Sequence, residues 1–360
     1  YTRLCINRRR DSPRASAGDT GRPAGACRVY PALMRAVLAT TPGGPEVLSV
    51  EQCPDPTAMP GRVVVAVEAA GVNFVDTYRR AGRYPMPFPH VVGSEGAGRV
   101  LAVGDDVTSV RVGDHVGWVS GSDGTYAEQT AVDADALVPL PEDLPADVAA
   151  AALLQGMTAQ YLVASTFPVT EGQHVLVHAG AGGTGLLLTQ LATARGASVV
   201  TTVSTEAKAE LSWDAGAAHV IRYDALGDLT AELPPLVREL TAGGVHTVFD
   251  GVGRSTFDAS LASLRLRGGL ALFGASSGPV PPVDPQRLNA AGSVFLTRPF
   301  LAHYIATREE LLGRASDVLG RVADGSLQVR VGERFPLADA AAAHRALEGR
   351  RTTGKVLLVP

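Results

Sequence analysis

The sequence predicts an α/β protein with two domains, in which a barrel-type β domain is joined to a doubly wound parallel sheet. Three observations lead to this fold class. The chain has 360 residues, about twice the length of a typical single domain. Short strand-like runs separated by Gly and Pro fill its first part, up to about Leu153. Beyond that point strand-like and helix-like segments alternate, as in a parallel sheet covered by helices.

The composition restricts the class of partner. Hydrophobic residues make up 46% of the chain and charged residues 19%, with no apolar run near the ~20 residues of a membrane span and no signal-type segment. The net charge is −4, but the first 31 residues hold seven Arg against two Asp, so the remainder is near −9. An acidic body without a basic stripe argues against nucleic acid as the main partner.

The Arg-rich leader and the cysteines indicate where the folded part begins and where the protein works. We expect residues 1–33 to be a disordered extension, with Met34 as the natural start. A transit peptide is the alternative, but Pro and Gly interrupt the segment repeatedly. Cys5 and Cys27 lie in the leader, which leaves Cys53 alone in the body. No disulfide framework is possible there, and we expect a cytoplasmic protein.

In the first part of the chain the β-type runs come first and helices follow. We expect strands at 62–67, 98–103, 115–119 and 136–140. An Ala-rich helix at 146–153 and a second helix at 157–165 then lead into the alternating region.

The alternating region has six expected strands. They lie at 174–178, 198–203, 219–223, 246–250, 270–273 and 293–297. Helical stretches between them lie at 186–195, 206–215, 229–240 and 256–265. The chain closes with a helix at 307–323, a β segment at 328–335, a helix at 337–347 and a strand at 355–359. We expect this tail to return to the first domain, so that the parallel sheet is an insertion.

A glycine-rich turn follows the first of the six strands. Gly180, Gly182 and Gly185 fit the pattern G-x-G-x-x-G between a buried strand and a helix. Such glycines permit a tight turn, the approach of backbone N–H groups to a pyrophosphate and close packing of helix on strand. The helix N-terminus adds partial positive charge. In this context the motif predicts dinucleotide binding.

The end of the second strand indicates which dinucleotide is bound. Ser204 takes the position where an acidic residue would hold the ribose of NAD, Lys208 can neutralise a 2′-phosphate, and Tyr223 ends the third strand nearby. These residues favour NADPH. Glu206 is the contrary feature, because it can serve as a ribose-binding acid or as a solvated residue at a helix start.

Dispersed motifs resemble the NADPH:quinone oxidoreductases, the zeta-crystallin-like, zinc-independent branch of the medium-chain dehydrogenase/reductase superfamily. They lie at 43–47, 71–78, 93–98, 113–116, 179–185 and 296–299, in the order found in that family, and the resemblance covers 34–360. It implies a GroES-like catalytic domain over 34–157 and 300–360, and a Rossmann NADPH-binding domain over 158–299. It also implies a homodimer formed near 293–297.

The zinc ligands of related alcohol dehydrogenases are missing. Asn73 stands where the usual ligand Cys would be, and Ser94 stands in place of the His before Glu95. The body has one Cys, so no four-Cys structural lobe exists. The eight His are scattered, and we interpret them as structural. We therefore expect no metal site.

The resemblance places Asn73, Asp76 and Tyr78 at the reacting centre, with Arg298 reaching the cofactor side. The implied roles are amide contacts from Asn73, orientation by Asp76 and a phenol hydrogen bond from Tyr78 to the acceptor or the ribose. Structural roles stay open: Asn73 can cap a turn, Asp76 can cap a helix, and Tyr78 can be half-buried packing. Lys355 is either a phosphate contact or a solvated lysine.

The resemblance also implies a set of side chains along the NADPH groove. These are Tyr161, Gly182, Gly183, Thr184, Ser204, Lys208, Tyr223, Gly251, Ser276, Ser277, Arg298 and Arg350. Quinones are electrophilic, so a hydride donor and hydrogen bonds to the developing oxyanion suffice to reduce them without a metal. Two alternatives remain: an NADPH-dependent enone or enoyl reductase acting on an activated C=C bond, and a non-catalytic NADPH- or RNA-binding protein.

Overall fold

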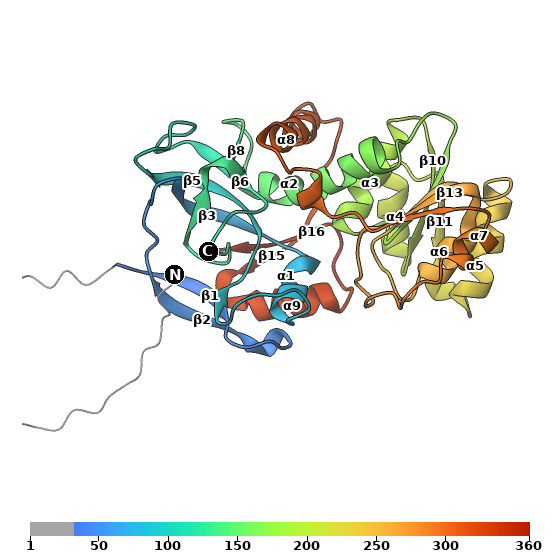
Figure 1. The fold of residues 1–360 in the computed structure, drawn as a ribbon, viewed down its shortest axis with the longest axis horizontal. Coiled ribbons are helices and arrows are strands. Elements are labelled where there is room, and N and C mark those ends of the chain that lie inside the picture. Colours follow the sequence, from blue (N-terminus) through green and yellow to red (C-terminus); the bar gives the residue numbers. More distant parts are fainter. Residues whose placement is uncertain (1–31) are drawn as a thin grey trace, which may run out of the picture.

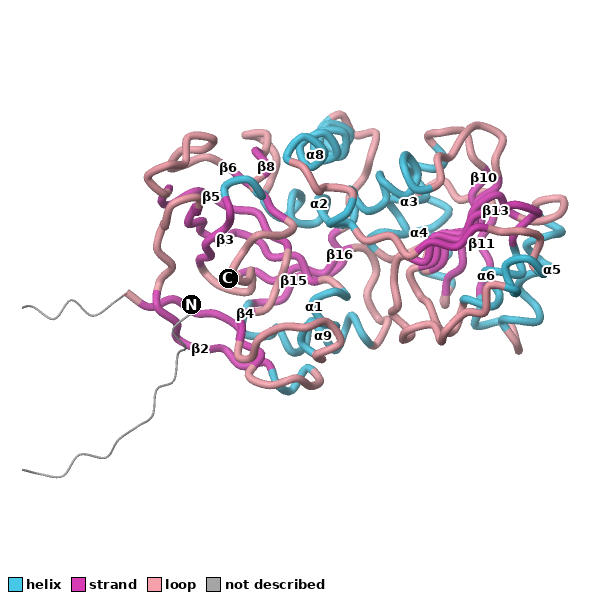
Figure 2. Tube along the Cα trace, in the orientation of Figure 1, coloured by secondary structure: helices cyan, strands magenta, loops and turns pink. Residues whose placement is uncertain are grey.

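The computed structural model describes residues 32–360. The expectation of a disordered leader falls almost entirely outside this range, because residues 1–31 are not described. Within the described residues the chain forms two groups of strands separated by helices (Figures 1 and 2). One group holds a seven-stranded and a three-stranded sheet, and the other is a six-stranded parallel sheet. The predicted α/β fold class is confirmed.

The first group contains the strands before residue 140 and the last two strands of the chain. The three-stranded sheet has the order β2-β1-β4, with β1 (Leu33–Ala39), β2 (Leu48–Pro54) and β4 (His90–Val91). The larger sheet has the order β15-β16-β3-β5-β6-β8, and β7 pairs with β3. Its strands are β3 (Arg62–Val72), β5 (Glu95–Val103), β6 (His115–Trp118), β7 (Gln129–Asp133), β8 (Val138–Pro139), β15 (Val331–Pro336) and β16 (Lys355–Val359). The C-terminal strand β16 therefore lies antiparallel to β3, far from it in sequence.

The second group is the doubly wound sheet, in the order β11-β10-β9-β12-β13-β14. Its strands are β9 (His174–His178), β10 (Ser198–Val203), β11 (His219–Arg222), β12 (Val245–Asp250), β13 (Leu264–Leu272) and β14 (Phe295–Thr297). The strand order reverses between β9 and β12. Ligands of such sheets bind beyond the carboxyl ends of the strands at this reversal.

Helices lie on this sheet, between the two groups of strands, and on the first group. They are α1 (Phe74–Arg80), α2 (Ala146–Tyr161), α3 (Gly183–Thr193), α4 (Glu206–Asp214), α5 (Leu229–Leu240), α6 (Phe257–Ser263), α7 (Gln286–Ala290), α8 (Arg308–Ala323) and α9 (Ala340–Glu348). Three of these begin with an N-cap side chain that accepts a backbone hydrogen bond: Thr205 at α4, Asp228 at α5 and Thr307 at α8.

Two expected element boundaries are wrong. The helices expected at 146–153 and 157–165 form one helix, α2, which continues into a π-helical turn at Leu162–Thr166. Gly156 lies inside this helix at the place where α8 packs closely, because a Cβ there would lie 2.5 Å from Val318 Cγ1. The strand expected at 270–273 begins instead at Leu264, which is fully buried and pairs with Val245.

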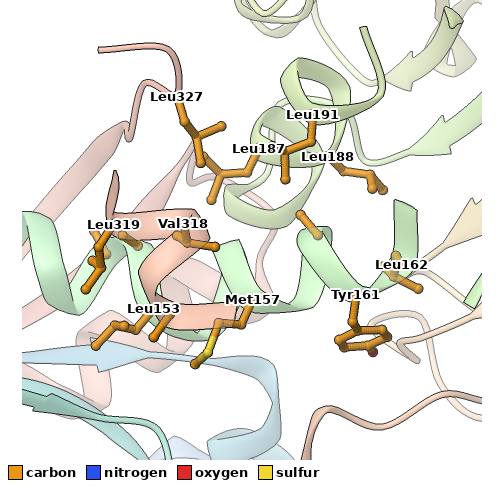
Figure 3. Packing of buried hydrophobic residues seen from close by; sticks show 14 of the residues in the cluster. Leu153, Met157, Tyr161, Leu162, Leu187, Leu188, Leu191, Val318, Leu319 and Leu327 are labelled. Atoms are coloured by element: carbon orange, nitrogen blue, oxygen red, sulfur yellow. The ribbon is translucent and has the colours of Figure 1, made fainter. Parts of the chain in front are cut away.

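Helix α2 is the centre of a core that joins the two groups of strands. Figure 3 shows Leu153 and Met157 of α2 beside Val318 of α8, and Leu187 and Leu188 of α3 in the same cluster. Burying each such side chain contributes about 1.5–3 kcal/mol. The segment Ala146–Thr166 is also the one in the described chain that is long and apolar enough to cross a membrane, but two-thirds of its most apolar window is buried inside the protein. A buried core helix can be as long and as apolar as a membrane span, because it too is surrounded by apolar side chains.

Candidate active site

A pocket of about 430 Å³ lies between the carboxyl ends of the parallel strands and the first group of sheets. The predicted site residues that line it are Asn73, Gly182, Gly183, Thr184, Ser204, Lys208, Tyr223, Gly251, Ser276 and Arg350. The predicted residues that lie outside its lining are Asp76, Tyr78, Tyr161, Ser277 and Arg298. Ten residues from segments spread between Asn73 and Arg350 are thus brought to one cavity.

The glycine-rich turn forms the floor of this pocket between β9 and α3. A Cβ on Gly185 would lie 2.3 Å from the carbonyl oxygen of Ala179, so helix and turn approach too closely for any side chain. Ala179 itself adopts a left-handed φ of 54°, which is costly for a residue with a Cβ. The backbone N–H of Gly354 donates to Ala181 O at 3.0 Å and ties the turn to the C-terminal segment. The N-terminus of α3 remains directed at the cavity.

The far end of the pocket is basic. Lys208 Nζ donates to Ser204 Oγ at 3.3 Å and to the carbonyl oxygen of Arg350 at 2.7 Å. Partial burial, helped by the charge of Arg350, lowers the pKa of Lys208. The contrary residue Glu206 is exposed and pairs with Arg222 at 2.8 Å. Its carboxylate is therefore engaged on the surface.

Asn73 lies at the other end of the pocket, where its amide is fully hydrogen-bonded. Its Oδ1 accepts from Lys355 Nζ at 2.8 Å and from Gln155 Nε2 at 3.0 Å. Its Nδ2 donates to Glu95 Oε2 at 3.0 Å and to Gly71 O at 3.2 Å. An amide has two donors and two acceptor sites, so none is left over. Asn73 is a fixed part of the wall, and a ligand contact from its amide would require it to give up one of these bonds.

The bonds around Asn73 depend on a buried ion pair between Glu95 and Lys355. Both side chains are at most 1% exposed, and the second carboxylate oxygen of Glu95 accepts from Leu154 N at 2.7 Å. The sequence predicted that Lys355 is either a phosphate contact or a solvated lysine. Both predictions are wrong, because Lys355 is buried in this ion pair. Gly71 has to be glycine here, since a Cβ would lie 2.4 Å from Glu95 Oε2.

Asp76 lies beneath Asn73 and caps helix α1. It accepts from Asn73 N at 3.0 Å, from Ser94 Oγ at 2.6 Å and from Tyr126 Oη at 3.2 Å. Burial raises the pKa of Asp76, although the hydrogen bond from Ser94 and the charge of Arg79 oppose the rise. Asp76 therefore caps helix α1, and its hydrogen bond from Asn73 N holds the backbone of Asn73 in place.

The hydrogen-bonded chain continues from Tyr126 to the surface. Arg80 donates to Nδ1 of His344 at 2.9 Å, so Nε2 of this neutral imidazole carries the hydrogen that faces Tyr126 at 3.1 Å. Burial, helped by the charge of Arg80, lowers the pKa of His344 to about 3. Arg80 also pairs with the partly exposed Glu348 at 2.8 Å. This chain fixes α1 against α9.

Two predicted tyrosines are buried at the edge of the site. Burial raises the pKa of Tyr78, opposed by a backbone hydrogen bond with Ala275 and by the charge of Arg298. The Tyr78 hydroxyl therefore reaches the second group of strands. Tyr161 is 1% exposed, and its ring stacks on that of Tyr304 with centroids 4.1 Å apart. Stacking inside the core is the reason that Tyr161 does not line the pocket.

The two remaining predicted residues lie behind or beside the cavity wall. Ser277 Oγ donates to Val252 O at 2.8 Å and accepts from Ser255 N at 3.0 Å, so it holds the loop after β12 in place. Arg298 is exposed and donates to the carbonyl oxygen of Pro299 at 3.1 Å.

Several lining residues were not predicted. They include Gln155, His178, Val252, Ser255, Phe273 and Thr352. Gln155 had a detectable signal, because it is an amide that directly follows the apolar run 148–154. His178 ends strand β9 and is buried, with its ring nitrogens 2.8 Å from Thr202 Oγ1 and 2.9 Å from Ser260 Oγ. Its burial lowers its pKa.

In the part of the chain that the structure describes, no group of three or more His, Cys, Asp or Glu side chains is arranged to hold a metal ion. Ser94, at one of the positions compared above with zinc ligands, accepts a hydrogen bond from Arg79 at 2.5 Å and donates to Asp76.

Two protein families match the chain in the two regions expected from its fold. The family described as alcohol dehydrogenase GroES-like domain matches residues 59–142, and the family described as zinc-binding dehydrogenase matches residues 183–312. Among proteins of known function, a quinone oxidoreductase of Pseudomonas aeruginosa is 41% identical over 88% of this chain and 97% of its own length. A 2-haloacrylate reductase of a Burkholderia species is 39% identical over 91% of this chain and 99% of its own.

A solved structure also matches the chain over most of its length. The mycobacterial protein Rv1454c, complexed with NADPH, is 52% identical, with a TM-score of 0.88 over 91% of this chain and all of that one. The match extends across both groups of strands. The chain therefore belongs to the quinone oxidoreductases of the medium-chain dehydrogenase/reductase superfamily.

Proposed function

We propose that the protein is an NADPH:quinone oxidoreductase that reduces a quinone by hydride transfer without a metal. The observation that carries this proposal is one continuous pocket with a glycine turn in its floor, a basic group at one end and a rigid polar cluster at the other. The Pseudomonas relative is a quinone oxidoreductase and the mycobacterial relative was solved with NADPH.

The residues of the pocket fit a dinucleotide. Because Gly182 and Gly183 carry no side chains, a pyrophosphate can approach the backbone N–H groups at the α3 N-terminus, where the helix dipole favours negative charge. Thr184 lines the same place, and Tyr223, Gly251 and Ser276 line the walls. NADPH, when bound here, supplies the hydride.

The basic end favours NADPH over NADH. A 2′-phosphate brings two negative charges, and Lys208 and Arg350 offer cationic groups beside the hydroxyl of Ser204. NAD-specific sites instead present a carboxylate to the ribose. The nearby carboxylate, Glu206, is held by Arg222.

The other end orients the acceptor and stabilises charge on its oxygen. Asn73 is a rigid wall that restricts how the quinone ring lies, and Asp76 acts as a positioning residue through the Asn73 backbone. Tyr78 and Arg298 lie beside the cavity rather than in its lining. In this proposal the Tyr78 hydroxyl donates to the developing oxyanion when the acceptor is bound, with the positive charge of Arg298 nearby. A quinone is electrophilic enough for these contacts to suffice.

Two positions compared with zinc ligands, and the neighbouring Glu95, already form hydrogen bonds or ion pairs within the protein, which supports metal-independent chemistry. Asn73 has a saturated amide, Ser94 is bound between Arg79 and Asp76, and Glu95 is paired with Lys355. Thiolate and imidazole ligands, which zinc prefers, are missing from all three positions.

Reduction of a conjugated C=C bond is the second candidate function. It is favoured by the 39% identity to a 2-haloacrylate reductase, whose substrate class is an activated alkene. Both reactions use the same hydride donor and the same pocket.

The direct test follows NADPH absorbance with purified protein that starts at Met34. A simple quinone, a conjugated enone and 2-chloroacrylate are compared in the presence of EDTA, with NADH in parallel. Turnover with the quinone that survives EDTA and prefers NADPH is expected. Turnover with the alkenes alone would favour the second candidate, and loss of activity with EDTA would contradict metal independence.

The chain divides into a catalytic domain, residues 34–157 and 300–360, and an NADPH-binding domain, residues 158–299, and works as a cytoplasmic homodimer. The dimer contact uses the free edge of β14, where Phe295 is 60% exposed and the neighbouring Leu266 is 72% exposed. Analytical ultracentrifugation should show a dimer that Phe295→Ser weakens. A monomer at micromolar concentration in the unaltered protein would contradict this.

A further inference from the structure

Gln155 on α2 has a hydrogen-bond acceptor that the protein does not use. Its Nε2 donates to Asn73 Oδ1 at 3.0 Å, whereas its carbonyl oxygen Oε1 is buried and meets no donor. The side chain lines the pocket. A buried amide oxygen without a donor is costly. Its retention at the wall of a cavity indicates that a ligand supplies the donor.

The polar neighbours of Gln155 do not supply that donor, because their hydrogen bonds are directed at other acceptors. Both N–H groups of the Asn73 amide are used, by Glu95 and Gly71. Lys355 Nζ points at Asn73 and Glu95. Gln155 is therefore the outer member of a rigid polar cluster and presents its oxygen from a core helix, where little conformational freedom is left to lose on binding.

The position of Gln155 identifies which ligand group is within reach. A Cβ on Gly183, the first residue of α3, would lie 3.3 Å from Gln155 Cδ, so the amide lies against the turn proposed to hold the pyrophosphate. A quinone carries acceptor oxygens only and cannot satisfy another acceptor. The cofactor carries ribose hydroxyls next to its phosphates. One ribose belongs with Lys208 at the basic end, which leaves the ribose on the nicotinamide side for Gln155.

We propose that Gln155 is a cofactor-binding residue whose Oε1 accepts a hydrogen bond from a hydroxyl of the nicotinamide-side ribose. This rests on the proposed use of NADPH. Gln155 would then make the hydrogen bond to the cofactor, because the amide of Asn73 has no unused donor or acceptor for it. The loss of this contact should affect ligands that contain the second ribose and spare ligands that end at the 5′-phosphate of the first.

The test measures dissociation constants by calorimetry for two probes, NADPH and 2′,5′-ADP, which keeps the 2′-phosphate half and lacks the second ribose. Gln155→Met keeps the length and apolar volume of the side chain but removes the acceptor. We expect the Kd for NADPH to rise about 5–10-fold, the effect of losing one such bond. The Kd for 2′,5′-ADP should stay unchanged, which also shows that the variant is folded.

Gln160→Met is the matched control, because Gln160 lies on the same helix and uses its amide with Asp317 and Arg314. It should leave both constants unchanged. An unchanged Kd for NADPH in Gln155→Met would overturn the assignment, and so would equal weakening of both probes, which would indicate a change in the turn itself. If the unaltered protein binds neither probe, the proposed function fails and this assignment fails with it.

Discussion

Two buried carboxylates, Asp250 and Glu95, support different parts of the same pocket wall. Asp250 ends strand β12 and accepts only from neutral donors nearby in sequence. These are the backbone N–H groups of Val252 and Gly253 and the hydroxyls of Thr256 and Ser260. Its network holds the loop that contributes Gly251 and Val252 to the cavity.

Glu95 is stabilised in the opposite manner. Its donors are Asn73, Leu154 N and Lys355, which are 22, 59 and 260 residues away in sequence. One of them is a full charge that is itself buried. A carboxylate bound by local neutral donors depends on its own loop, whereas one bound by a distant cation depends on the assembly of β3, β5, α2 and β16. The first should therefore respond mildly to substitution and the second severely.

The largest expected effect is that of Lys355→Met. It leaves the carboxylate of Glu95 buried without its cation, so the free energy of unfolding should fall by about 3–5 kcal/mol. Urea unfolding followed by circular dichroism measures this.

A second variant separates the lost charge pair from lost packing. Adding Glu95→Gln to Lys355→Met removes the uncompensated charge and should recover a large part of the stability. A loss below about 1 kcal/mol in the single variant would mean that the pair is not buried as described.

Asp250→Asn should have a smaller effect on the local network. The amide nitrogen of Asn would face donors that need an acceptor, which costs about 2 kcal/mol of unfolding free energy. Asp258→Asn is the matched control, since Asp258 is exposed and pairs with Arg287 at the surface, and it should change stability by less than about 0.5 kcal/mol. Equal losses in the two variants would show that burial of Asp250 does not matter.

The third expected effect is a dependence of the unfolding free energy on pH, which arises from His344. Its pKa in the folded protein is about 3, below the ordinary value of 6.5. Between these values the unfolded chain binds more protons than the folded one, so stability falls as the pH falls through this window, by up to ~1.4 kcal/mol per pH unit. His344→Gln should reduce that slope. Replacing the exposed His303 in the same way should leave it unchanged, and equal slopes in the wild type and His344→Gln would contradict the buried neutral imidazole.

The smallest expected effect concerns the turn itself. Ala179 has a left-handed φ of 54°, so Ala179→Gly should raise the unfolding free energy by about 0.5–1 kcal/mol. Ala192→Gly within helix α3 should instead lower it by about 1 kcal/mol. Differential scanning calorimetry of the two variants checks the sign, and destabilisation by Ala179→Gly would contradict the strained geometry.

The same contrast explains what the sequence could predict. The turn at Gly180–Gly185, the six strands and the cluster of Ser204, Lys208 and Tyr223 follow from short spacings, because each is set within one βα unit. The Glu95–Lys355 pair joins the two ends of the chain, and no local pattern marks it. For the same reason the interpretation of Lys355 as solvated or phosphate-binding was wrong. Tyr161 was placed along the cofactor groove without knowledge of Tyr304, on which its ring stacks. The roles of the individual site residues remain predictions.

The most direct test of NADPH:quinone oxidoreductase activity is the ratio of kcat/KM for NADPH to that for NADH, with one quinone, in the wild type and in Lys208→Ala. A wild type that prefers NADPH, and a variant that loses about 10–100-fold in kcat/KM with NADPH but little with NADH, is the predicted result. A wild type that prefers NADH, or a variant that loses equally with both cofactors, would contradict the assignment of the basic end of the pocket to the 2′-phosphate.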